Sequence, residues 1–201
     1  MASRKLEDLV AGLQEKAKLV QQACEEAAGF DLLIYCTLRP LEEQARLWRQ
    51  SRSRHEIDLK QQTMRSRGYD LLADIIESVG PQYGEHVTNA APGESWHNYG
   101  EAFDAVPLLG GKPAWNYLKA KSYWDAYGEA VRQAGLFWAG DWISFREYPH
   151  AQLRQGGNPL KTLTPDQVYA TLEANGLLPK PAAGKKTGRR KTSTNKPAEA
   201  A

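Results

Sequence analysis

Ten residues in the middle of the chain, 95–104, read Ser-Trp-His-Asn-Tyr-Gly-Glu-Ala-Phe-Asp. The asparagine and Gly100 are turn-forming residues, so a turn is predicted around His97. The apolar run that follows predicts a short buried strand that contains Asp104 and ends at Pro107. A turn that leads directly into a strand can bring the side chains of His97 and Asp104 close together.

A second motif, residues 141–150, reads Asp-Trp-Ile-Ser-Phe-Arg-Glu-Tyr-Pro-His. Its proline favours an extended backbone leading into a strand from His150 to Leu153, and Glu147 lies three residues before that histidine. Two imidazoles and one carboxylate suit Zn²⁺, and three protein ligands leave a fourth position open, as in catalytic zinc sites. We therefore predict that His97, Asp104 and His150 bind Zn²⁺.

Together, the two motifs resemble the zinc peptidases that cleave peptidoglycan stem peptides. These are the D-alanyl-D-alanine carboxypeptidases and dipeptidases and the L-alanyl-D-glutamate endopeptidases of phage endolysins. The sequence of residues 95–104 and the Gly-Asp-Trp motif at residues 140–142 look most like those of the endopeptidase branch. The resemblance extends from about Leu33 to Leu153. It implies an α+β fold of the Hedgehog/D-Ala-D-Ala-peptidase-like type, in which helices surround a small antiparallel sheet that bears the zinc site.

The resemblance also implies roles for individual residues. Glu147 would be the catalytic base, and Arg39 would point at the substrate carbonyl oxygen and stabilise its developing negative charge. The glycine and tyrosine that the family places before this arginine are absent. Ser95 would contact the substrate or, alternatively, cap a turn. Trp142 would either line the substrate groove or pack against neighbouring residues. Asp141 would hold an imidazole or simply occupy a turn.

The rest of the chain predicts helices around the sheet. A length of 201 residues with 41% hydrophobic residues predicts one domain with one core. Hydrophobic periodicity and capping residues predict helices over residues 6–28, 41–49, 69–79, 122–134 and 164–176, and strands over 32–36 and 136–139. Residues 50–67 are dense in charge, which indicates a solvated loop or an exposed helix. The segment 50–86 would be either a flap beside the site or inert decoration.

The chain divides into a zinc peptidase domain, residues 1–178, and a basic tail, residues 179–201. From Lys180 onward there are seven Lys or Arg and one Glu, a net charge of +6, so the total of +2 leaves −4 on the remainder. The tail has almost no apolar residues and is predicted to be disordered. It would either bind polyanions, such as anionic polymers of the cell envelope, or remain solvated without a partner.

The remaining features limit where the protein acts and how it is built. Cys24 and Cys36 are interpreted as reduced core residues, although the sequence leaves a disulfide open. The N-terminus lacks the pattern of a signal peptide, and no stretch approaches the roughly 20 apolar residues of a membrane span. We expect a monomer made in the cytoplasm, which reaches the cell wall through a holin-type pore, as the resembled phage enzymes do.

Three functions remain open from the sequence. The first is an L-alanyl-D-glutamate endopeptidase that acts on peptidoglycan stem peptides, as in endolysin-type lysis. The second is a D-alanyl-D-alanine carboxypeptidase that uses the same chemistry. The third is a non-enzymatic zinc module that binds the cell wall, and the presence of Glu147 argues against it.

Overall fold

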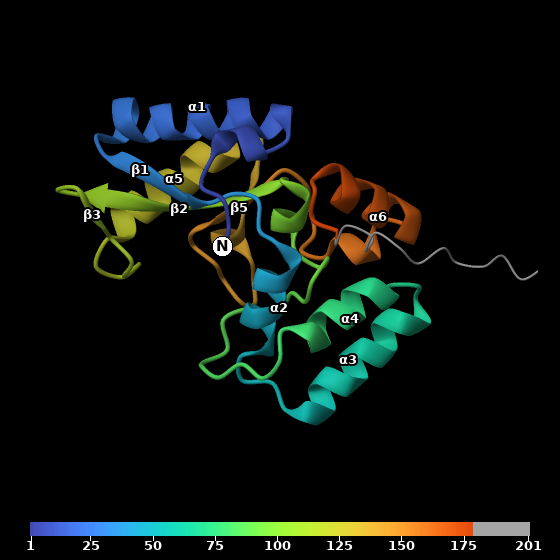
Figure 1. Ribbon diagram of the computed structural model, residues 1–201. Coiled ribbons are helices and arrows are strands. Elements are labelled where there is room, and N and C mark those ends of the chain that lie inside the picture. The colour runs from blue at the N-terminus through green and yellow to red at the C-terminus, as the bar shows by residue number, and fades with distance from the viewer. Residues whose placement is uncertain (179–201) are drawn as a thin grey trace, which may run out of the picture.

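The structure is a computed structural model that describes residues 1–178 (Figure 1). The predicted basic tail, residues 179–201, lies outside the described residues. The α-helices are α1 (Ala11–Ala28), α2 (Leu41–Arg49), α3 (Arg54–Ser66), α4 (Asp70–Ser78), α5 (Lys121–Gln133) and α6 (Pro165–Ala174). The strands are β1 (Asp31–Cys36), β2 (Ala102–Leu109), β3 (Lys112–Pro113), β4 (Phe137–Trp138) and β5 (His150–Gln152). Short 3-10 helices are η1 (Leu6–Asp8), η2 (Trp96–Tyr99), η3 (Ala139–Asp141) and η4 (Pro159–Lys161).

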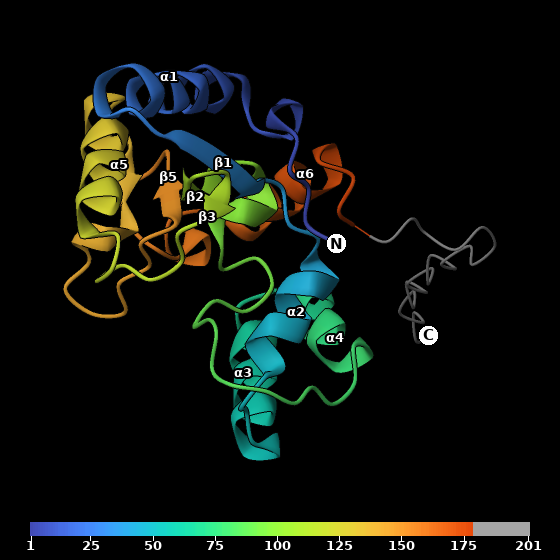
Figure 2. The same cartoon turned by 90° about the vertical axis from the view of Figure 1, so that its left-hand side faces the viewer.

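The strands form one antiparallel sheet in the order β1-β2-β5-β4, with β3 paired to β2. Helices α1 and α5 lie side by side over the sheet, and their apolar residues bury one face of it (Figures 1 and 2). Phe103 of β2 and Ala151 of β5 point into this cluster. The predicted α+β architecture with a small antiparallel sheet is therefore confirmed.

A second hydrophobic cluster lies below the sheet and is built from α2, α3, α4, α6 and η2 (Figure 2). The prediction of a single core is wrong, because the chain buries two clusters that meet at neighbouring residues of β2, Ala102 and Phe103. The charged segment 50–67 is mostly helix α3, which begins at a capping box formed by Ser53 and Glu56. Its buried face packs on α4, so α3 and α4 form one side of this second cluster, and residues 79–86 follow them as an irregular loop.

A β-bulge in β1 decides which side chains face the site. Ile34 pairs with Ala105 and points into the cluster under α1 and α5, whereas Cys36 pairs with Asp104 two residues later on β1 but only one residue away on β2. The extra residue, Tyr35, reverses the alternation of the strand. Cys36 therefore faces away from the apolar cluster, on the same side of the sheet as Asp104.

Two predicted element boundaries are wrong for identifiable reasons. The helix predicted from residue 6 breaks before α1, because the N–H of Val10 donates to the carbonyl oxygen of Gly100 at 2.9 Å instead of continuing a helix. The strand predicted to end at Pro107 continues to Leu109. Pro107 lies between the pairing of β2 with β5, which stops at Asp104, and its pairing with β3, so its missing N–H costs no ladder bond.

The other predicted elements lie close to their expected positions. The last helix begins as predicted, with Thr164 and Gln167 forming a capping box. Both cysteines are free and buried. Within residues 1–178, no helix combines the length and the apolar character that crossing a bilayer requires.

Candidate metal centre

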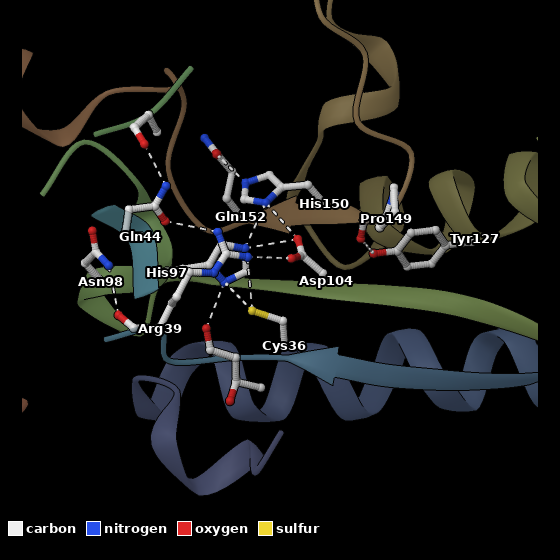
Figure 3. A network of polar contacts seen from close by, with 12 residues as sticks. Cys36, Arg39, Gln44, His97, Asn98, Asp104, Tyr127, Pro149, His150 and Gln152 are labelled. Carbon is white, nitrogen blue, oxygen red and sulfur yellow. Dashed lines mark hydrogen bonds and ion pairs between the residues drawn. The ribbon is translucent and has the colours of Figure 1, made fainter. Parts of the chain in front are cut away.

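Three donor atoms meet on the face of the sheet that α1 and α5 leave uncovered (Figure 3). The Nε2 atom of His97 lies 3.0 Å from Oδ1 of Asp104 and 3.1 Å from Nδ1 of His150, and the last two atoms are 3.1 Å apart. Donor atoms around a tetrahedral zinc ion lie roughly 3.3 Å apart. A triangle of this size therefore needs to open by only a few tenths of an ångström to hold Zn²⁺.

The chain brings these residues together by two local devices. Asp104 and His150 are direct cross-strand partners on β2 and β5, so their side chains point to the same face. His97 comes from η2, so the turn predicted around this residue is a short 3-10 helix. Gly100 ends η2 at a φ of 67°, and a Cβ there would lie 2.8 Å from the carbonyl oxygen of Asp8, so a glycine is required where the chain turns into β2.

The hydrogen bonds on the outer side of each imidazole show that the inner nitrogens carry lone pairs. Nδ1 of His97 lies 2.8 Å from the carbonyl oxygen of Thr37, which can only accept, so that nitrogen holds the proton. Nε2 of His150 lies 2.9 Å from Oε1 of Gln152. The amide nitrogen of Gln152 donates to the carbonyl oxygen of Gly156 at 2.9 Å, which fixes Oε1 as the acceptor towards His150. With both imidazoles neutral, three electron-pair donors thus face one another, an arrangement that suits a bound cation.

The electrostatics of the site agree with a bound cation. Burial lowers the pKa of His97, which keeps this imidazole neutral. Burial opposes charge on Asp104 and on His150 as well, but their mutual interactions outweigh it: the pKa of Asp104 lies well below its usual value and that of His150 is raised. The pocket therefore favours one carboxylate and a positive charge at its centre, which suits a divalent metal.

Gln152 offers the first test of this geometry. Replacing Gln152 with Ala removes the acceptor that fixes the tautomer of His150, and we expect the affinity for Zn²⁺ to fall about 10–100-fold. Competition with a chromophoric chelator measures the change. Gln133→Ala, in the exposed last turn of α5, is the matched control and should bind Zn²⁺ as the wild type does. Equal affinities in the two variants would contradict the tautomer assignment.

Arg39 holds the outer oxygen of the aspartate. Its Nη2 donates to Oδ2 of Asp104 at 3.0 Å and to the sulfur of Cys36 at 3.2 Å, and its Nη1 donates to Oε1 of Gln44 at 3.0 Å (Figure 3). Asn98 fixes the loop beneath, because its amide donates to the carbonyl oxygen of Arg39 at 2.8 Å. The guanidinium thus leaves Oδ1 of Asp104 free for the metal. Its predicted contact with a substrate carbonyl stays a prediction.

A cavity of about 1050 Å³ opens beside the triangle, and Glu147 lines it together with the three donors and Arg39. Burial raises the pKa of Glu147, the charge of His150 opposes this rise, and the charge of Asp104 adds to it. The Glu147 carboxylate forms no ion pair within residues 1–178. An unpaired acid with a raised pKa next to a metal site is well placed to exchange protons.

Ser95 and Trp142 also line the cavity. The hydroxyl of Ser95 does not cap η2, so the alternative of a turn-capping serine is wrong. The ring of Trp142 lies 5.8 Å from that of His150, so this side chain both packs on a donor residue and forms part of the cavity wall. No residue of the segment 50–86 contributes to the lining within the described part of the chain.

Comparison with known proteins places this site in a family. The VanY family model, described as D-alanyl-D-alanine carboxypeptidase, matches residues 7–112, which is more than half of the chain. The chain belongs to this family. A second model with the same description matches residues 88–153, a range that includes all three donor residues and Glu147.

Two individual proteins are similar to this VanY-family chain. The peptidoglycan L-alanyl-D-glutamate endopeptidase CwlK of Bacillus subtilis is 32% identical over 93 residues, 43% of this chain and 56% of the relative. The chain thus spans about half the length of that curated relative. The crystal structure of the Serratia marcescens L-Ala D-Glu endopeptidase ChiX covers 77% of this chain and 89% of its own, at 18% identity and a TM-score of 0.41.

Cys36 offers a competing donor in this VanY-family site. Ligand atoms of Cys36, His97 and Asp104 lie within 4.8 Å of one another. The sulfur, however, lies 3.6 Å from Nδ1 of His97, the nitrogen that faces Thr37, and burial raises the pKa of the thiol to about 12. A protonated thiol on the far edge of the imidazole is a poor ligand, so the triangle that includes His150 is the better candidate for a metal site.

The groups that hold the two imidazoles in place were not predicted from the sequence. Asp141 does not hold an imidazole: its carboxylate accepts two hydrogen bonds of 3.0 Å from Arg132 on the surface. The imidazoles are instead held by the Thr37 carbonyl and by Gln152. Strand alternation could have indicated Gln152, since it lies two residues after His150 and so faces the same way. A backbone carbonyl such as that of Thr37 leaves no trace in the sequence.

Proposed function

We propose that this chain is a zinc-dependent peptidase that hydrolyses peptidoglycan stem peptides at the L-alanyl-D-glutamate bond. The observation that carries the proposal is the triangle of three donor atoms, 3.0–3.1 Å on each side, next to a half-buried Glu147 that lines the cavity and has no ion-pair partner within residues 1–178. The choice of bond is supported by the L-alanyl-D-glutamate endopeptidase activity for which the 32% identical relative from Bacillus subtilis is named.

His97, Asp104 and His150 would hold the zinc, and they fit it because their inner atoms are unprotonated. A zinc ion held there would lower the pKa of its bound water towards neutrality and polarise a substrate carbonyl. Glu147 accepts the proton of the attacking water and passes it to the nitrogen of the leaving amine. Its raised pKa favours the first transfer, because a carboxylate with a higher pKa is a stronger base towards the attacking water.

The other lining residues would position the peptide. Arg39 keeps Asp104 oriented and presents its remaining donors to the cavity. Ser95 contributes a hydroxyl that does not cap η2, and Trp142 supplies an apolar wall beside His150. These substrate contacts rest on the lining of the cavity and on the family resemblance.

A second candidate is a D-alanyl-D-alanine carboxypeptidase with the same site. The description of both matching family models favours it. The two activities differ in their products, since the endopeptidase leaves a free L-alanine carboxyl end on the glycan and the carboxypeptidase releases free D-alanine.

Defined muropeptides test both candidates. We expect the purified protein to release free amines from a muropeptide that contains the full stem peptide, and mass spectrometry to show cleavage after L-alanine. A chelator should abolish the release, and added Zn²⁺ should restore it. Release of D-alanine alone would select the carboxypeptidase. Binding of peptidoglycan without any cleavage would select a non-enzymatic zinc module.

A further inference from the structure

The donors near the metal centre are unequally available to a substrate. Both hydrogens on Nη2 of Arg39 are taken, one by Asp104 and one by Cys36, and Nη1 already donates to Gln44. A peptide carbonyl that develops negative charge gains most from a donor fixed in place beforehand and free to bind it. The guanidinium meets the first condition, but most of its hydrogens already have acceptors within the protein.

Tyr35 meets both conditions. It is the extra residue of the bulge in β1, directly before Cys36, and it lines the same cavity as Glu147 and the donor triangle. Its ring makes an edge contact with that of Trp115, with centroids 5.2 Å apart at 76°, which restricts its orientation. The Tyr35 hydroxyl makes no hydrogen bond to another group within residues 1–178, whereas the hydroxyl of buried Tyr127 donates to the carbonyl oxygen of Pro149 at 2.9 Å.

Tyr35 lines the cavity beside the donor triangle, and the charged groups of that site act on its hydroxyl. Burial raises the pKa of Tyr35 above its usual value, the charges of Asp104 and Glu147 raise it further, and Arg39 opposes them. The phenol is therefore protonated and neutral, so it can donate without cancelling the charge of Glu147. Tyr148, which also lines the cavity, instead stacks flat on Tyr117 with centroids 3.8 Å apart.

We propose that Tyr35 is a further catalytic residue, whose hydroxyl donates a hydrogen bond to the carbonyl oxygen of the peptide bond that is cleaved. This inference rests on the proposed peptidase function. It adds the Tyr35 hydroxyl, on the bulged strand, to the remaining donors that Arg39 presents to the cavity while it holds Asp104. The bulge thus serves two purposes, since it turns Cys36 towards Arg39 and brings the phenol to the cavity.

The test compares Tyr35→Phe with the wild type on a defined muropeptide. Phenylalanine keeps the ring and removes only the hydroxyl, so the melting temperature and zinc content should not change. We expect kcat to fall about 10²-fold, the effect of removing one donor from an oxyanion site, while KM stays within about twofold. Tyr83→Phe, an exposed tyrosine outside the cavity, is the control and should keep full activity.

The outcomes separate this inference from the function on which it rests. An active wild type with a Tyr35→Phe variant whose kcat is unchanged would overturn the assignment and leave the peptidase intact. A rise in KM alone would also overturn it, because the hydroxyl would then bind the ground state only. A wild type that cleaves no muropeptide would overturn the peptidase function and the role of Tyr35 together.

Discussion

Replacing Glu147 with Gln is expected to leave the metal in place and to lower kcat by about 10²–10⁴-fold, the range that a positioned proton acceptor supplies. The amide has the same shape and fills the same part of the cavity, so the donor triangle should not change. It has no basic oxygen to take a proton from water and no proton to give the leaving amine. Zinc content by elemental analysis and kcat on a defined muropeptide measure the two effects separately.

Glu85→Gln is the matched control, because Glu85 is exposed and does not line the cavity. This variant should match the wild type in both zinc content and kcat. If Glu147→Gln instead lost its zinc, Glu147 would be a ligand rather than the base. If it kept both zinc and full activity, the proton acceptor would have to be another group of the cavity.

The donor set could be predicted from the sequence because its residue types are unusual in their surroundings. A buried carboxylate in an apolar strand, as at Asp104, is costly unless a cation or hydrogen bonds compensate it. His97 and His150 lie next to turn and strand signals that bring them to the same sheet face. The family resemblance rested on these same residues, and the structure brings the three side chains together as predicted.

What the sequence did not reveal depends on strand register and on backbone groups. A bulge at Tyr35 shifts the pairing by one residue, and no local pattern predicts where such a shift occurs. Without it, Cys36 would be a core residue, as we expected from the apolar run. Helix α4 was predicted over residues 69–79, but the role of α3 was obscured, because the dense charge of residues 50–67 hides the few apolar positions that pack against α4.

The arrangement also explains why the metal site tolerates burial. Asp104 is held by Arg39, His97 by the Thr37 carbonyl and His150 by Gln152, so each donor residue has one fixed partner on its outer side. Such outer partners orient the ligands before the metal arrives. Removing a partner should therefore weaken the affinity for the metal, whereas removing a donor should abolish it.

Replacing His97 or His150 with Ala is accordingly expected to abolish both zinc binding and activity. Each change leaves two donors and opens a void in a buried site, so Zn²⁺ at micromolar concentration should no longer bind in a 1:1 ratio. The wild type should be stabilised by zinc, by roughly 4 kcal/mol at a thousandfold excess over its dissociation constant, and thermal unfolding with and without Zn²⁺ measures this difference. Both variants should show no such stabilisation.

His55→Ala serves as the matched control, since His55 lies on the exposed side of α3 and outside the cavity. It should bind one zinc ion, gain the full stabilisation and cleave the muropeptide at the wild-type rate. Added imidazole provides a further check, because it can occupy the space of a deleted side chain and restore a nitrogen donor. Full zinc content in either alanine variant without added imidazole would remove that histidine from the ligand set and return Cys36 to consideration as the third donor.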